Sequence, residues 1–165
     1  MRYPLMLIIG SFFSVAVQAA DIELTTRVSG VVEEVFVKAG QRVKKGAVLL
    51  RLDKTIYQAQ VDEAGAEGDR LRAEEAEAKR DLDRAQELYS RTVSSTTELD
   101  AAKLRYTRAK SALTVAESRL TIARKNLMDT ELKAPFNGVV TILPAAPGVV
   151  VAAECQPRAL AVMRR

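Results

Sequence analysis

The residues that could carry chemistry in this 165-residue chain are mainly carboxylates and cations, without the usual catalytic partners. The absence of histidine removes the common general base, the common metal ligand and any Ser–His or Cys–His nucleophile. The single cysteine, Cys155, can form no internal disulfide and is expected to be a small buried residue. Carboxylates alternate with Lys and Arg, as over residues 74–81, which is typical of solvated helix faces. The sequence therefore predicts no enzyme, no metal centre and no cofactor.

The charges are also too mixed to predict a nucleic-acid partner. The chain holds 25 Lys and Arg against 21 Asp and Glu, and both signs are interspersed along its middle. Tyr57, Tyr89 and Tyr106 recur on a helical stripe, so packing accounts for them better than base stacking. We therefore expect a non-enzymatic protein that binds other proteins and no nucleic acid.

The N-terminus has the composition of an export signal. Arg2 precedes an apolar run over residues 5–17, and small residues follow it. The run is shorter than the roughly 20 apolar residues that span a bilayer. We expect residues 1–19 to be a signal peptide cleaved after Ala19, with retention as an uncleaved anchor as the alternative.

Residues 54–130 have the pattern of a long helical hairpin. Apolar and small residues recur with alternating spacings of four and three, a heptad stripe that makes two helices wind about each other. The leucines of this seam are Leu71, Leu82, Leu113, Leu120 and Leu127. The short connection forces the helices antiparallel, and Thr96 or Thr97 is expected to cap the second helix. Bending or fraying is expected near Gly65, Gly68 and Glu75.

Two β-like stretches flank the hairpin, over residues 20–53 and 131–165. Each has short β-branched runs separated by glycines. The two stretches match at an offset of 108 residues, which pairs Gly30 with Gly138, Gly40 with Gly148, and Val43 with Val151. The match weakens beyond Val151, where Glu154 replaces the glycine found at position 46. We predict an α+β protein in which two halves form one β-domain, with turns at the four paired glycines and the hairpin inserted between the halves.

The split Gly-Val-Val half-motifs around a heptad hairpin resemble the periplasmic membrane fusion proteins, the HlyD-like adaptors of tripartite efflux pumps. The residues that carry the resemblance are 28–35, 37–46 and 49–53 in the first half, and 132–140 and 147–148 in the second. The resemblance implies a split biotinyl/lipoyl-like domain, also called a barrel-sandwich hybrid, in the periplasm of a Gram-negative bacterium and associated with the inner membrane. It also implies an inner-membrane transporter of the RND or ABC type, a TolC-like outer-membrane channel, and self-association into a ring, expected to be a hexamer.

The resemblance extends to the hairpin tip, where channel-docking members carry a pattern similar to Arg-x3-Leu-x6-Ser. Arg84, Leu88 and Ser95 have these spacings. Arg84 and Leu88 lie one helical turn apart, so they offer a forked donor and an apolar knob on one face. Ser95 is expected to bond exposed carbonyls at a helix end. An ordinary surface arginine beside a seam leucine is the alternative interpretation.

The chain departs from most adaptors in having no segment for a β-barrel or a membrane-proximal domain, so we expect a short form of the family. Three other functions stay open. One is an adaptor of an ABC-type or type I secretion exporter, and another is a periplasmic coiled-coil scaffold without a transport role. The third is a lipoyl or biotinyl carrier, which is disfavoured because Lys54 precedes a long helix and no Met-Lys-Met is present.

Overall fold

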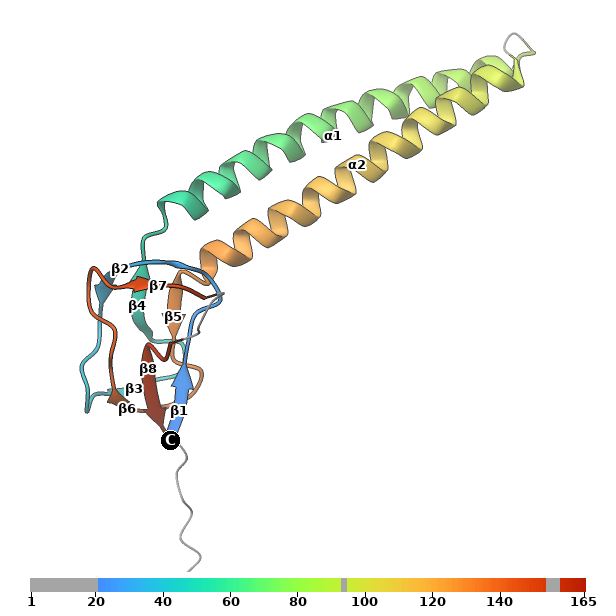
Figure 1. Cartoon of the computed structure of the whole chain (residues 1–165). Helices are drawn as coiled ribbons and strands as arrows, with labels where there is room; N and C mark the ends of the chain where they lie inside the picture. The colour runs from blue at the N-terminus through green and yellow to red at the C-terminus, as the bar shows by residue number, and fades with distance from the viewer. Residues whose placement is uncertain (1–20, 93–94, 154–157) are drawn as a thin grey trace, which may run out of the picture.

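The computed structural model describes residues 21–92, 95–153 and 158–165, which form a β-domain and a long helical hairpin (Figure 1). Residues 1–19, Glu154 and Cys155 lie outside the described residues, so the expectations for them stay predictions. The elements, in chain order, are β1 (Asp21–Leu24), β2 (Gly30–Val35), β3 (Arg42–Val43), β4 (Val48–Leu52), α1 (Thr55–Ser90), α2 (Thr96–Met128), β5 (Glu131–Lys133), β6 (Gly138–Ile142), β7 (Val150–Val151) and β8 (Ala161–Arg164).

The β-domain consists of two four-stranded antiparallel sheets that are built in the same way. One sheet has the order β1-β8-β6-β3 and the other has the order β5-β4-β2-β7. The equivalent strands of the two halves are β1 and β5, β2 and β6, β3 and β7, and β4 and β8. Exchanging each strand for its equivalent converts one order into the other, so the halves are related by an approximate twofold axis. Each sheet takes two strands from each half, and neither half can close its sheet alone.

The register of the strands follows the 108-residue offset. Val43 pairs with Gly138 across β3 and β6, and the equivalent residues Val151 and Gly30 pair across β7 and β2. The adjoining backbone hydrogen bonds repeat too, because Gly40 N donates to Val140 O at 2.7 Å and Gly148 N donates to Val32 O at 2.8 Å. The predicted duplication is therefore a structural repeat.

Only two of the four glycines that were expected in turns lie in turns. Gly40 and Gly148 have φ of 84° and 86°, a left-handed conformation that favours glycine. Gly30 and Gly138 instead begin β2 and β6, so the prediction of turns there is wrong. Close packing explains why position 138 is a glycine, since a Cβ there would lie 2.3 Å from the carbonyl oxygen of Arg164.

The core also has two related parts. One cluster of buried side chains comprises Val28, Val32, Leu50, Leu52, Ala145, Val151 and Leu160. The other comprises Val37, Val43, Leu49, Ala134, Val140, Ala161 and Met163. Leu132 and Leu143 pack against both clusters and join them into one interior. Because every cluster takes residues from both halves, the β-domain is a single folding unit interrupted by the hairpin.

The chain leaves the β-domain after β4 to form the hairpin and returns to it at β5, and these two strands are neighbours. β4 ends two residues before α1, α2 is followed by β5, and β4 and β5 pair with each other. Leu52 N donates to Thr130 O at 2.8 Å, which holds the two junctions side by side. α1 continues without a break through Gly65, Gly68 and Glu75, so the expected fraying is not found. The helices extend about 54 Å and 50 Å from the β-domain.

The heptad stripe lies between the two helices. Leu71 and Leu82 are buried on α1, and Leu113, Leu120 and Leu127 are half-buried on α2. Alanines are the buried residues between them on α2, which allows a close approach of the two helices. An ion pair across the helices joins Arg72 Nη2 to Glu117 Oε1 at 3.3 Å. The long hairpin thus presents a stiff rod with its turn far from the β-domain (Figure 1).

Candidate functional site at the hairpin tip

The tip of the hairpin is held by a small apolar cluster one to two turns below it. Leu82, Leu99 and Ala102 are buried there, and Ala85 and Tyr106 pack against them. These residues come from both helices, so they fix the helix ends relative to each other. Side chains beyond this cluster are therefore presented from a defined backbone.

Ser95 caps α2, a role that was expected of Thr96 or Thr97. Its Oγ accepts a hydrogen bond from Glu98 N at 3.3 Å, and Glu98 Oε2 accepts from Ser95 N at 3.1 Å. This reciprocal pair is a capping box, which satisfies free amide groups at a helix N-terminus. Ser95 therefore bonds an amide at the start of α2, and the expected bond to exposed carbonyls stays a prediction. The spacing Ser-x-x-Glu over residues 95–98 could have identified this cap from the sequence.

Arg84 and Leu88 are both exposed beside this cap. The Arg84 side chain is 69% exposed and its Nη1 lies 3.3 Å from Asp81 Oδ1, one turn earlier on α1. Leu88 is 40% exposed and lies in the last turn of α1. A shallow groove at this place is lined by Asp81, Arg84, Ala85, Leu88, Glu98 and Arg105, which we call the tip groove. The groove offers an apolar knob among charges of both signs.

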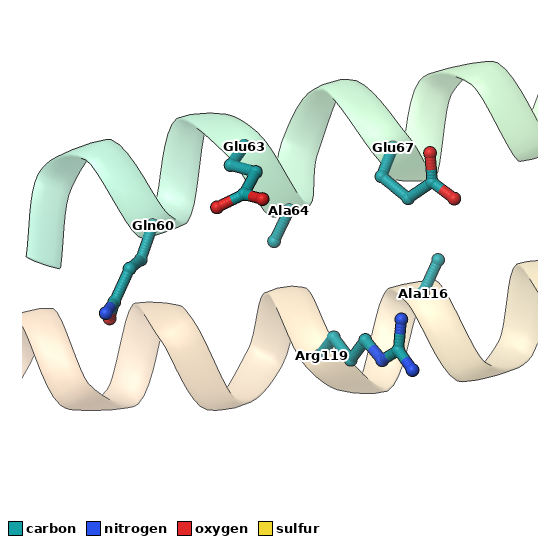
Figure 2. A pocket seen from close by; sticks show the side chains of 6 residues that line it. All are labelled: Gln60, Glu63, Ala64, Glu67, Ala116 and Arg119. Atoms are coloured by element: carbon teal, nitrogen blue, oxygen red, sulfur yellow. The ribbon is translucent and has the colours of Figure 1, made fainter.

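A second hollow lies on the shaft of the hairpin, nearer the β-domain. Figure 2 shows Gln60, Glu63, Ala64 and Glu67 of α1 facing Ala116 and Arg119 of α2. Ala64 and Ala116 leave the space, and Arg119 reaches from α2 toward α1. A hydrogen bond from Arg70 lowers the pKa of Glu67, with a smaller effect from the charge of Arg119. Glu67 is paired with Arg70 at 2.7 Å, an exposed ion pair of the kind that is common on solvated helix faces.

The base of the hairpin is tied to the β1–β2 loop by two hydrogen bonds that sequence analysis did not identify. Tyr57 Oη donates to Ser29 O at 2.6 Å, and Thr26 Oγ1 donates to Asp129 O at 3.0 Å. One bond holds the start of α1 and the other holds the end of α2. The hairpin is therefore attached to the β-domain at the start of α1 and at the end of α2. No spacing rule would have linked these distant residues.

The features of a carrier or metal protein are not found in the described part of the chain. Lys54 is exposed at the start of α1, and Asp53 Oδ1 accepts a hydrogen bond from Thr55 N at 2.9 Å beside it. Hydrogen bonds from Thr55 lower the pKa of Asp53. Across the described residues, no group of three or more His, Cys, Asp and Glu could hold a metal ion. Nor does any helix there combine the length and apolar character that crossing a membrane requires.

The β-domain, its inserted rod and the exposed tip define a class of protein. Residues 21–161 match the family model of the CzcB-like barrel-sandwich hybrid domain. The chain therefore belongs to this family, and its fold is that of the membrane fusion proteins. The fold class and the family expected from the half-motifs are confirmed.

Individual relatives point in the same direction. The chain is 32% identical over 132 residues to the uncharacterized protein YdhJ of Escherichia coli K12, covering 80% of this chain and 46% of YdhJ. It is 29% identical over 121 residues to the efflux pump periplasmic linker BepD of Brucella suis, covering 73% and 30% of the two chains. MacA of Actinobacillus actinomycetemcomitans has a similar structure, with a TM-score of 0.63 at 26% identity over 84% of this chain and 47% of MacA. This chain spans less than half the length of each of these proteins.

Proposed function

We propose that the chain is a periplasmic adaptor subunit of a tripartite efflux pump. The observation that carries the proposal is the exposed Leu88 and Arg84 at the end of a rod of about 50 Å, held in place by the cluster of Leu82, Leu99 and Ala102. Arginine is enriched among the residues that carry binding energy at protein interfaces, so an exposed Arg84 beside an apolar side chain on a rigid support suits such a contact. The relationship to BepD, an efflux pump periplasmic linker, supports the same function.

In this proposal the tip groove contacts a TolC-like outer-membrane channel, and the inner partner is a transporter of the RND or ABC type. The Arg84 guanidinium would bond carbonyl or carboxylate groups of the channel, while Leu88 fills an apolar recess. Residues 1–19 direct export and are then removed. Residues 20–53 and 131–165 form the lipoyl-like halves, and residues 54–130 form the hairpin. The protein is neither an enzyme nor a carrier, because adaptor function needs only binding surfaces.

The charges of the two helices support self-association into a ring. α1 carries ten Asp and Glu against five Lys and Arg, whereas α2 carries three against seven. The hairpin therefore has an acidic side and a basic side. Copies that place α1 of one hairpin beside α2 of the next make a heterologous interface, which closes into a ring when the rotation allows it. We propose a ring, with six copies as the expected number.

The experiment that tests the tip introduces a photo-crosslinking residue at position 88 in cells that express the protein. Position 95 is unsuitable for the probe because replacing Ser95 removes the cap of α2. A crosslink from position 88 to an outer-membrane channel supports the proposal. Crosslinks only to other copies of the chain would contradict it and favour a periplasmic scaffold.

A substitution tests the same contact through transport. Leu88→Asp places a charge in the tip groove and is expected to abolish efflux, measured as dye accumulation, while the protein remains folded and exported. Ile122→Asp is the matched control, since Ile122 is 61% exposed on α2 and far along the helix from the tip. Normal efflux with Leu88→Asp would refute the tip assignment, as would an equal loss with both variants.

A further inference from the structure

The two related halves of the β-domain differ in chemistry at one set of equivalent turns. At the 108-residue offset, Lys38, Arg42, Lys44 and Lys45 of the first half correspond to Ala146, Val150, Ala152 and Ala153 of the second. The four cations are exposed and lie within eight residues of one another. We call them the basic end. Its counterpart carries no charge at the equivalent positions.

The backbone is the same at both places, so the fold does not require these charges. Lys45 N donates to Asn137 Oδ1 at 2.7 Å, and Ala153 N donates to Ser29 Oγ at 3.0 Å. Asn137 and Ser29 are themselves 108 residues apart. Gln41 N donates to Lys38 O at 3.1 Å, and the equivalent Val149 N donates to Ala146 O, also at 3.1 Å. Alanine and valine thus satisfy the same local structure that the first half builds with lysine and arginine.

The charges of the basic end are not neutralised by any ion pair in the part of the chain that the structure describes. Across the described ranges, no ion pair involves any of the four cations, whereas Arg70, Arg72 and Lys79 on the hairpin each have a carboxylate partner. The sequence has no Asp or Glu between Glu34 and Asp53. Four like charges that repel one another and stabilise nothing locally indicate an anionic partner outside the chain.

The basic end lies at the end of the β-domain that faces away from the hairpin (Figure 1). Strand register places Asp21, Arg164, Val139 and Arg42 in one row across the sheet, because each pairs with the next. Asp21 is therefore roughly 14 Å from Arg42, three strand spacings away. The 20 residues that precede Asp21 in the sequence include the apolar run over residues 5–17. The segment proposed to direct export therefore joins the β-domain at the level of the basic end.

We propose that the basic end binds anionic phospholipid headgroups at a membrane surface. Three of its four cations are lysines, compact point charges that suit mobile headgroups better than the planar fork that arginine offers to a fixed carboxylate. Each Lys or Arg near an anionic membrane surface strengthens binding about fivefold. Binding in this way points the hairpin away from the membrane. The surface is separate from the tip groove and acts without a channel contact.

The experiment measures binding of the full chain to lipid vesicles by co-sedimentation in 50 mM salt. Vesicles of phosphatidylcholine alone are compared with vesicles that contain phosphatidylglycerol, so binding through an apolar N-terminus cancels in the difference. The test variant combines Lys38→Ala, Arg42→Val, Lys44→Ala and Lys45→Ala, which transfers the second half's own residues to the first. The control variant removes four exposed cations outside the basic end, α2 and the tip groove, with Arg27→Ala, Lys54→Ala, Arg72→Ala and Arg80→Ala.

The proposal predicts binding that depends on phosphatidylglycerol, falls with added salt and weakens at least about 30-fold in the test variant. The control variant has the same net charge as the test variant but is expected to bind like the original protein. Circular dichroism checks that both variants are folded. The proposal is overturned if the original protein ignores phosphatidylglycerol or if both variants lose binding equally. Binding to polyglutamate without binding to vesicles, lost in the test variant, would assign the basic end to an acidic protein.

Discussion

Gly30 and Gly138 occupy equivalent positions at the starts of β2 and β6, but their surroundings differ. A Cβ at Gly30 would lie 3.6 Å from Leu52 Cβ, an ordinary contact, whereas one at Gly138 would lie 2.3 Å from the Arg164 carbonyl oxygen. We expect Gly138→Ala to lower the free energy of unfolding by about 3 kcal/mol, because β8 must move away from β6. Gly30→Ala is the control and is expected to cost under about 1 kcal/mol. Urea denaturation measures both, and equal costs would contradict the predicted close packing at Gly138.

Ser95 shows how a tip residue can act through its own helix. Ser95→Ala removes the acceptor for Glu98 N, so we expect a loss of about 1 kcal/mol in stability and faster hydrogen exchange at the first turn of α2. Ser95→Asp keeps an acceptor at the same place and is expected to restore the slow exchange. The two variants also separate a cap from a channel contact. Normal efflux with Ser95→Asp would mean that the serine serves the helix, and unchanged exchange in Ser95→Ala would contradict the capping role.

At the scale of elements, the period of the sequence was sufficient to predict both helices and the repeat. Heptad spacing identified the antiparallel hairpin, and the 108-residue offset identified two equivalent halves. The offset did not reveal that each sheet combines strands of both halves, because equivalence says nothing about which copies pair. The cap at Ser95 was missed because Ser and Thr are similar as caps, and only Glu98 distinguishes the correct one. The tethers from Tyr57 and Thr26 depend on three-dimensional contacts and leave no periodic signal.

α1 runs over 36 residues without interruption, although it contains Gly65 and Gly68. A Cβ added at Gly65 or at Gly68 would meet nothing within 4 Å, so neither glycine is required by packing. We expect Gly65→Ala and Gly68→Ala each to raise the free energy of unfolding by up to about 1 kcal/mol, because alanine has the higher helix propensity. Thermal denaturation followed at 222 nm measures the gain. A loss of stability in Gly68→Ala alone would indicate that the helices approach more closely in solution.

For the whole molecule, the distribution of titratable groups predicts how stability depends on pH. The chain has no histidine, so few groups change charge between pH 5.5 and 7.5. Hydrogen bonds lower the pKa of Asp21, through Arg164, and of Glu131, through Lys133. A carboxylate whose pKa is lower in the folded state stabilises the fold above its unfolded pKa of roughly 4, and that stability disappears as the pH falls through the lower folded value.

We therefore expect the urea midpoint to be constant from pH 5.5 to 7.5 and to fall steadily below about pH 4.5. Asp21 and Arg164 join β1 to β8 with distances of 2.9 Å from Nε to Oδ1 and from Nη2 to Oδ2, and this bidentate pair links the two ends of the described chain. Asp21→Asn removes the titrating group, so its stability should decrease less steeply between pH 4.5 and 3 than that of the original protein. The comparison is made at low ionic strength, because salt screens an exposed pair. A slope in the midpoint between pH 6 and 7, or identical acid slopes for Asp21→Asn and the original protein, would show that other groups control the acid response.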